Sequence, residues 1–137
     1  MKHTTLVLFA LVIIGAVIFA AGCISPASET PKGTWVLIGS GPDNTPITGI
    51  ITLDIADSNI SGNSGVNNYF GSITVSSDGK SIISDLGSTK MAGTEEEMQA
   101  ESAFFSALKG SAGYSIVDSN LIITGTDGKK LLVFVRE

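Results

Sequence analysis

The sequence has very few of the side chains on which ordinary catalytic and metal sites depend. It contains one histidine, His3, and one cysteine, Cys23, and both lie near the N-terminus of the 137-residue chain. Histidine is the usual base near neutral pH and the commonest zinc ligand, while a thiolate is the usual soft nucleophile. A domain that follows Cys23 therefore has no histidine-based triad, no cysteine nucleophile, no thiolate metal site and no intramolecular disulfide.

Positive charge is also scarce. The chain has eight Lys and Arg residues against thirteen Asp and Glu residues, which gives a formal net charge of -5 at pH 7. Lys2 is the only charged residue ahead of Cys23, so the remainder of the chain is more acidic still. Because an acidic surface disfavours phosphate backbones, we expect no nucleic acid partner.

An uncharged apolar run follows Lys2 and ends in three small residues, Ala20, Ala21 and Gly22, directly before Cys23. Such an arrangement is typical of a lipoprotein signal, in which the thiol is alkylated with diacylglycerol and the chain is cleaved ahead of it. We therefore expect residues 1–22 to be a signal peptide. The lipid on Cys23 would then attach the protein to a membrane.

The same apolar run is about as long as the roughly 20 residues that a spanning helix needs, so an uncleaved transmembrane anchor is the alternative. Lys2 would hold its N-terminal end in the cytoplasm. Both interpretations place the rest of the chain outside the cytoplasm, in the cell envelope or at the cell surface. In that location Asn59 fits the three-residue acceptor pattern for N-glycosylation, because Ser61 follows it two residues later.

The remainder of the chain divides into a tether and one domain. Residues 23–33 are rich in Ser, Pro, Thr and Gly, which cannot bury apolar area, and we expect a flexible tether there. Residues 34–137 have the size of one domain, and their short β-branched runs between Gly, Asp and Asn predict strands. The predicted strands cover residues 34–38, 49–55, 59–62, 69–75, 81–86, 114–117, 121–124 and 130–136.

One helix is predicted between the fifth and sixth of these strands. Thr94 and Glu97 have the spacing of a capping box, and Lys109 with Gly110 forms a stop signal. Residues at spacings of three and four mark one face of the helix: Met98, Glu101, Phe105 and Leu108, with Phe104 beside them. The predicted fold class is α+β, an antiparallel meander of about eight strands that can curl into a partly closed barrel, with one helix packed against it.

Four motifs, at residues 34–37, 60–71, 88–93 and 97–105, follow one another in an order that resembles the META-domain family of HslJ-like lipoproteins. The match spans nearly the whole domain. The resemblance implies a compact β-rich domain with one helix, often on an envelope lipoprotein and sometimes linked to heat, antibiotic or envelope stress. It implies no established enzymatic reaction and transfers no catalytic residue.

The two cysteines of the family motifs are absent from this chain. Where the second motif usually reads Gly-Cys-Asn, the chain has Gly65, Val66 and Asn67, and where the third usually ends in Ala-Cys, it has Ala92 and Gly93. Loss of both together is what one expects if the two cysteines normally cooperate. No redox or disulfide role remains here.

Glu101 is the acid of greatest interest in the domain. Helical spacing places it on the apolar face of the predicted helix, where an ionised carboxylate is costly unless it is hydrogen-bonded. We expect a structural anchor that accepts hydrogen bonds from backbone amides or from a turn hydroxyl, for example in the Ser88-Thr89 segment. A ligand-binding role is the alternative.

Three further residues could serve either packing or binding. Asn67 and Tyr69 follow a run of Gly, Asn and Ser that a turn explains, with a glycan or peptide site as the alternative. Trp35 alternates with Leu37 on the first strand, so we expect core packing rather than ligand stacking.

These observations favour a non-enzymatic, membrane-anchored protein that binds or stabilises an unidentified envelope protein or ligand. A small-molecule or glycan module with a pocket at the mouth of the sheet is one alternative, and a cavity lined by Trp35 or Tyr69 would indicate it. A hydrolase that relies on carboxylates alone is the other, and it needs two acids in one cleft. The candidate acids are Asp54, Asp57, Asp85 and Glu101. The sequence predicts no cofactor and no metal site, since no loop has the oxygen spacing of a calcium site.

Overall fold

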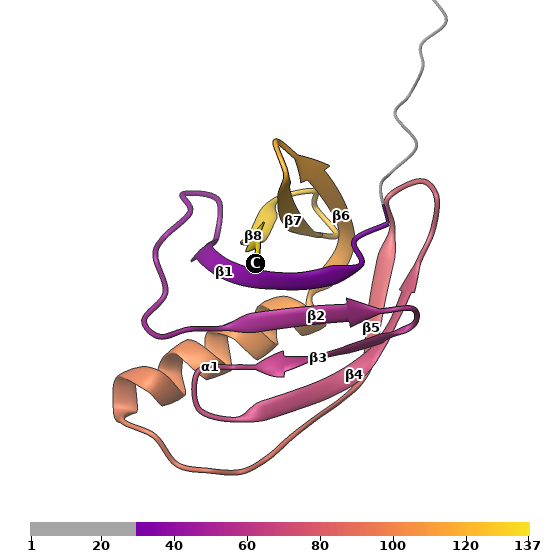
Figure 1. Ribbon diagram of the computed structural model, residues 1–137. Coiled ribbons are helices and arrows are strands. Elements are labelled where there is room, and N and C mark those ends of the chain that lie inside the picture. Colours follow the sequence, from indigo (N-terminus) through magenta and orange to yellow (C-terminus); the bar gives the residue numbers. More distant parts are fainter. Residues whose placement is uncertain (1–29) are drawn as a thin grey trace, which may run out of the picture.

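The computed structural model describes residues 30–137, so Cys23 and the predicted signal peptide lie outside the described residues. Within that range the chain forms eight strands and one helix, α1 (Glu95–Lys109), which follows the fifth strand (Figure 1). The strands are β1 (Gly33–Ser40), β2 (Thr52–Ala56), β3 (Asn59–Asn63), β4 (Asn68–Val75), β5 (Ser81–Ser88), β6 (Ser111–Val117), β7 (Asn120–Gly125) and β8 (Lys130–Arg136). Within residues 30–137, no helix has the combination of length and apolar character that a membrane crossing demands.

All eight strands belong to one antiparallel sheet, in the order β5-β4-β3-β2-β1-β8-β7-β6. The outer strands β5 and β6 meet at one end, where Lys80 forms an isolated bridge with Gly113 and the Tyr114 amide donates to the Gly79 carbonyl oxygen over 2.8 Å. The sheet is therefore a curled half-barrel. This confirms the predicted α+β fold with a partly closed barrel and one helix.

The strand connections adopt the backbone that their turn residues favour. Asp57 and Asp118 have φ angles of 55° and 49°, in the left-handed region that Asp tolerates better than most residues. Two strands begin more than one residue away from their predicted starts. β2 starts at Thr52 rather than at residue 49, where the positive φ of Gly49 bends the chain, and β6 starts directly after the helix, at Ser111.

The helix begins and ends as predicted. The Thr94 side chain accepts a hydrogen bond from the Glu97 amide over 3.3 Å, the Thr94 amide donates to Glu97 Oε2 over 2.8 Å, and Gly110 is the C-cap. This reciprocal pair is the capping box that the sequence indicates.

The buried face of α1 was predicted only in part. Glu101, Phe104 and Leu108 are buried, whereas the Met98 side chain is 39% exposed and Phe105 is half-buried. Adjacent phenylalanines both fit a period of 3.6, so spacing alone does not decide which one enters the core. Phe104 enters it, and Phe105 and Met98 lie at the edge of the helix face, where they can contact a ligand.

The domain core extends into the segment predicted as a tether. Trp35 is completely buried, and its Nε1 donates to the carbonyl oxygen of Pro31, itself buried, over 2.9 Å. Lys32 forms an ion pair with Asp57 over 2.7 Å. Packing therefore starts at Pro31, three residues ahead of the predicted boundary at Thr34, because the indole N–H needs a partner when it is buried.

Candidate functional site

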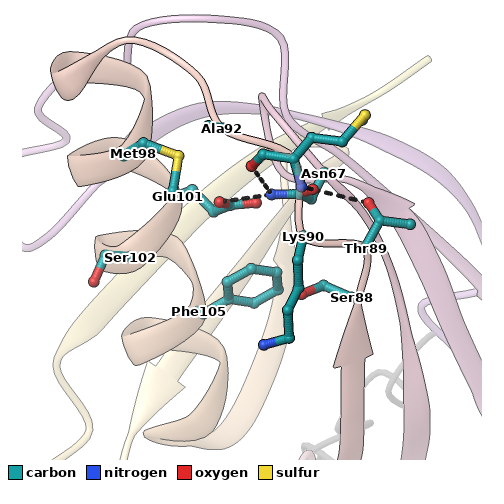
Figure 2. A pocket seen from close by; sticks show the side chains of 10 residues that line it. Asn67, Ser88, Thr89, Lys90, Ala92, Met98, Glu101, Ser102 and Phe105 are labelled. Atoms are coloured by element: carbon teal, nitrogen blue, oxygen red, sulfur yellow. Dashed lines mark hydrogen bonds between the residues drawn. The ribbon is translucent and has the colours of Figure 1, made fainter.

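A groove of about 460 Å³ lies between α1 and the chain that follows β5. One wall is formed by residues 88–92, and the other by Met98, Ser102 and Phe105 on the helix, with Glu101 between them (Figure 2). The groove mixes an aromatic ring and the Met98 thioether with hydroxyl groups. Such a mixture is typical of small-molecule sites, in which apolar walls carry a few placed polar groups.

Asn67 fixes the position of the loop wall. Its Nδ2 donates to Glu101 Oε2 and to the Met91 carbonyl oxygen, both over 3.1 Å. Its Oδ1 accepts from the Thr89 hydroxyl over 2.9 Å and from the Met91 amide over 2.6 Å (Figure 2). The side chain is 3% exposed. One buried amide thus joins the end of β5, the loop before α1 and the helix itself.

Glu101 is buried on the helix and hydrogen-bonded through both carboxylate oxygens. Oε1 accepts from the Ser64 hydroxyl, and Oε2 accepts from Asn67. These bonds offset the cost of removing a carboxylate from water. The predicted hydrogen bond from a turn hydroxyl to Glu101 comes from Ser64. In the Ser88-Thr89 segment, which was the example given in the prediction, the Thr89 hydroxyl donates to Asn67 instead.

The turn that presents Ser64 and Asn67 follows from its local sequence. The Ser64 amide donates to the Asn67 carbonyl oxygen over 2.8 Å, which closes the turn. Gly65 has a φ of 99°, a conformation that strains any residue with a Cβ, and its amide donates to the side chain of Asn63 over 2.8 Å. The Gly, Asn and Ser composition of this run therefore serves to aim two buried polar groups at α1.

The two positions at which the resembling family has cysteines are neighbours in space. A Cβ placed on Gly93 would lie 2.9 Å from Val66 Cγ2 and 2.7 Å from Glu97 Oε2. Val66 thus occupies the space next to Gly93 beside the N-terminus of α1. The two departures from the family motifs compensate each other sterically, because an added side chain at residue 93 would collide with Val66.

Trp35 and Tyr69 do not line the groove. Both are buried in the core, where the Tyr69 hydroxyl donates to the Thr52 carbonyl oxygen over 2.7 Å and its ring lies 5.4 Å from that of Phe104. Burial, together with the nearby Asp54 charge, raises the pKa of Tyr69. Because neither aromatic side chain lines it, the groove is a different site from the pocket that was considered at the mouth of the sheet.

The four candidate acids make separate sets of contacts. Asp54 accepts from the Thr34 hydroxyl over 3.0 Å, and Asp57 pairs with Lys32, which lowers the pKa of that carboxyl. Asp85 accepts from its neighbour Ser84, and Glu101 bonds to the turn described above. No group of three or more potential metal-ligating side chains gathers anywhere in residues 30–137. Asn59, the candidate glycan acceptor, is exposed at the start of β3.

Sequence reasoning missed most of the groove. Lys90, Met91 and Ser102 line it, yet none of them belongs to a recognisable ligand pattern. Lys90 and Met91 lie in the third family motif and Ser102 lies in the fourth, so membership of these motifs was the available signal. The groove arises where a loop and a helix meet, and only the folded chain brings them together.

Comparison with known proteins supports this fold. A family model described as META domain matches residues 28–137. The chain resembles an NMR structure of a protein from Burkholderia xenovorans with a TM-score of 0.64 and 28% identity, covering 77% of this chain and 82% of that one. It also resembles the crystal structure of a DUF4847 family protein from Bacteroides vulgatus, with a TM-score of 0.57 and 16% identity over 77% and 93% of the two chains. None of the curated proteins matches the sequence.

Proposed function

Because the chain belongs to the META domain family, whose model matches residues 28–137, we propose that it is an envelope protein whose domain binds a partner without catalysing a reaction. The lipid on Cys23 attaches it to the outer face of a membrane. The apolar run ahead of Cys23 and the small residues at positions 20–22 support the anchor.

The groove between α1 and residues 88–92 is the single observation that carries the binding function. Its shape is set by the buried bonds of Asn67 and Glu101, so the site is largely formed before a ligand arrives. A preformed site avoids the entropy cost of ordering a loop on binding. This supports a binding role for the domain over that of a mere spacer at the membrane.

The distribution of acids supports a role without catalysis. Carboxylate-based hydrolysis needs two carboxyl groups flanking one bond, at a separation of about 5 to 10 Å in a cleft. Glu101 lines the groove, whereas Asp54, Asp57 and Asp85 are engaged elsewhere by Thr34, Lys32 and Ser84. With both oxygens of Glu101 occupied by the turn, this acid is a structural anchor of the groove.

The anchor can be tested with a Cys23→Ser variant in cells fed an alkyne-bearing palmitate. The full-length wild-type chain should incorporate the label, sediment with membranes and be digested by protease added to spheroplasts. The variant should lose the label. A wild-type chain that carries no label, or that added protease cannot reach, would refute the proposed anchoring and location.

The binding role needs a separate variant. Ser102 is exposed and lines the groove, so Ser102→Trp fills the cavity without removing a buried contact. Ser106→Trp, one turn further along and exposed but outside the groove-lining set, is the matched control. Native protein captured with its lipid intact should retain a bound molecule or protein in the wild type and the control, and lose it in Ser102→Trp. Equal retention by all three would refute the groove as the binding site.

A further inference from the structure

We propose that the groove between α1 and β5 binds a single-chain amphiphile with an anionic head group, represented by a long-chain carboxylate. This assignment rests on the proposed binding function and names its ligand class. Three features carry it: the elongated shape of the groove, its apolar lining and two lysines beside it.

The groove continues along the helix beyond the first cavity. A second hollow of about 80 Å³ shares Ser88 and Phe105 with the first and extends to Gly87 and Lys109. On the helix side the lining runs from Met98 to Lys109, a distance of about 16 Å at 1.5 Å per residue. An elongated groove of this kind suits an extended alkyl chain better than a compact ring.

The lining supplies apolar contacts that adapt to a chain. Met98 is 39% exposed, and the flexible thioether of methionine packs well against irregular apolar ligands. Phe105 is held from behind, with its ring 5.7 Å from the rings of both Tyr69 and Phe104. The groove thus combines one rigid aromatic surface, Phe105, with one adaptable side chain, Met98.

Charge selects an anion. Lys90 lines the larger hollow and Lys109 the smaller one, although the chain has only eight Lys and Arg residues. The ion pairs of residues 30–137 involve Lys32, Lys80 and Lys129, so Lys90 and Lys109 are both available to a ligand.

The one acid in the groove does not oppose this charge preference. Glu101 faces Asn67 and Ser64, which occupy its two oxygens. Figure 2 shows the Lys90 side chain extending away from Glu101 and toward Phe105. The cationic and carboxylate ends of the groove are therefore separate, and an anionic head group beside Lys90 avoids the acid.

The structure favours an alkyl chain over a peptide strand in this place. β5 is a terminal strand of the sheet and could in principle accept another strand along its free edge. However, Asp85 has a φ of 54°, and the pairing of β4 with β5 shifts register between Phe70 and Ser72. This bulge interrupts the regular row of backbone groups that an added strand requires, whereas an alkyl chain needs no such register.

The test uses the full-length chain in lipid nanodiscs and a dodecanoate that carries a diazirine, with adducts mapped by proteolysis and mass spectrometry. Adducts should concentrate in residues 86–92 and 98–109. Unlabelled dodecanoate should compete, and dodecyltrimethylammonium, with the same chain and opposite charge, should compete at least about tenfold less well.

The lysines are tested in Lys90→Met with Lys109→Met, which keeps the apolar stems and removes both charges. Labelling should fall about tenfold in this double variant, since each charge-assisted contact contributes roughly threefold. The matched control, Lys80→Met with Lys129→Met, removes two lysines from exposed turns and should stay within about twofold of the wild type. Circular dichroism melting verifies that both double variants are folded.

Adducts spread over the domain, equal competition by the cationic amphiphile, or unchanged labelling in the Lys90 and Lys109 variant would each overturn the assignment. Failure of the anchoring proposal is distinguishable, because palmitate labelling of Cys23 is scored separately. Groove adducts on an unlipidated chain would refute the anchor alone, and a lipidated chain without groove adducts would refute the ligand class alone.

Discussion

Asn67 is the residue that holds the candidate site together, through four hydrogen bonds to three other residues. The sequence indicates only that a turn occurs there. Its partners lie 22 to 34 residues away along the chain, and no local pattern specifies such contacts. The buried side chain is therefore a structural clamp of the site, and its substitution is the sharpest test at this scale.

Asn67→Asp should lower the free energy of unfolding by about 3 kcal/mol. The substitution keeps the shape but replaces the Nδ2 donor with an oxygen that faces Glu101 Oε2 and the Met91 carbonyl oxygen. Asn68→Asp, at an exposed neighbouring position, is the control and should cost less than about 0.5 kcal/mol. Urea denaturation measures both. Equal losses in the two variants would contradict the role of Asn67.

Glu101→Gln should lower the free energy of unfolding by about 1 kcal/mol, and Glu101→Leu should lower it by about 3 kcal/mol. The Ser64 hydroxyl can turn to donate to the Asn67 carbonyl oxygen, 2.8 Å away, and then accept from the introduced amide, so Gln is partly accommodated. Leu offers no acceptor. Glu96→Gln, at an exposed position on the same helix, is the control for loss of charge. The structural role would be refuted if both Glu101 variants melted like the wild type.

The raised pKa of Tyr69 predicts that the protein loses stability in alkali. Its pKa is raised in the folded state, so above about pH 10 the unfolded chain gives up the phenol proton while the folded chain keeps it. Stability is then fully present below about pH 10 and falls with rising pH, by about 1.4 kcal/mol per pH unit. Urea denaturation between pH 9 and pH 11.5 measures this slope.

Tyr69→Phe is the matched variant for that measurement. It loses the hydrogen bond to the Thr52 carbonyl oxygen, which should lower stability by about 1 kcal/mol at pH 9. It should also lose the Tyr69 contribution to the alkaline slope. Identical slopes for wild type and variant would show that the phenol titrates normally.

At the scale of elements, the sequence predicts the two ends of α1 accurately, but it predicts the buried face of this helix only in part. The capping box and the terminal glycine are local signals, and both ends of the helix agree with them. Which phenylalanine enters the core depends on where the helix lies against the sheet. The helix is placed by its contacts with Tyr69 and with the turn around Ser64. The spacing of residues within the helix carries no information about either contact.

The contact between the loop before α1 and the turn after β3 can be tested with a disulfide. Val66→Cys with Gly93→Cys should form a disulfide, because an added Cβ at residue 93 lies within 2.9 Å of Val66 Cγ2. The disulfide closes the chain segment between residues 66 and 93, and it should raise the free energy of unfolding by about 3 kcal/mol relative to the reduced form. Thiol titration and melting with and without reductant provide the measurement. Two persistently free thiols under oxidising conditions would contradict the neighbouring positions of these residues.

At the scale of the whole molecule, the number of strands and the antiparallel meander follow from turn residues and β-branched runs, and both predictions are confirmed. For the closure of the half-barrel, the sequence predicts only that the meander can curl. The closure depends on β8 returning to β1 and on the meeting of Gly79 with Tyr114, both of which join distant parts of the chain. The groove escaped prediction for the same reason.

The central claim concerns the whole protein: a binding domain held at the outer face of a membrane by lipid on Cys23. Mass spectrometry of the N-terminal peptide, isolated from the membrane fraction of cells that make the protein, tests it most directly. The account predicts a peptide that begins at Cys23 and carries a diacylglyceryl group on sulfur. An unmodified peptide that begins at Met1 would contradict it.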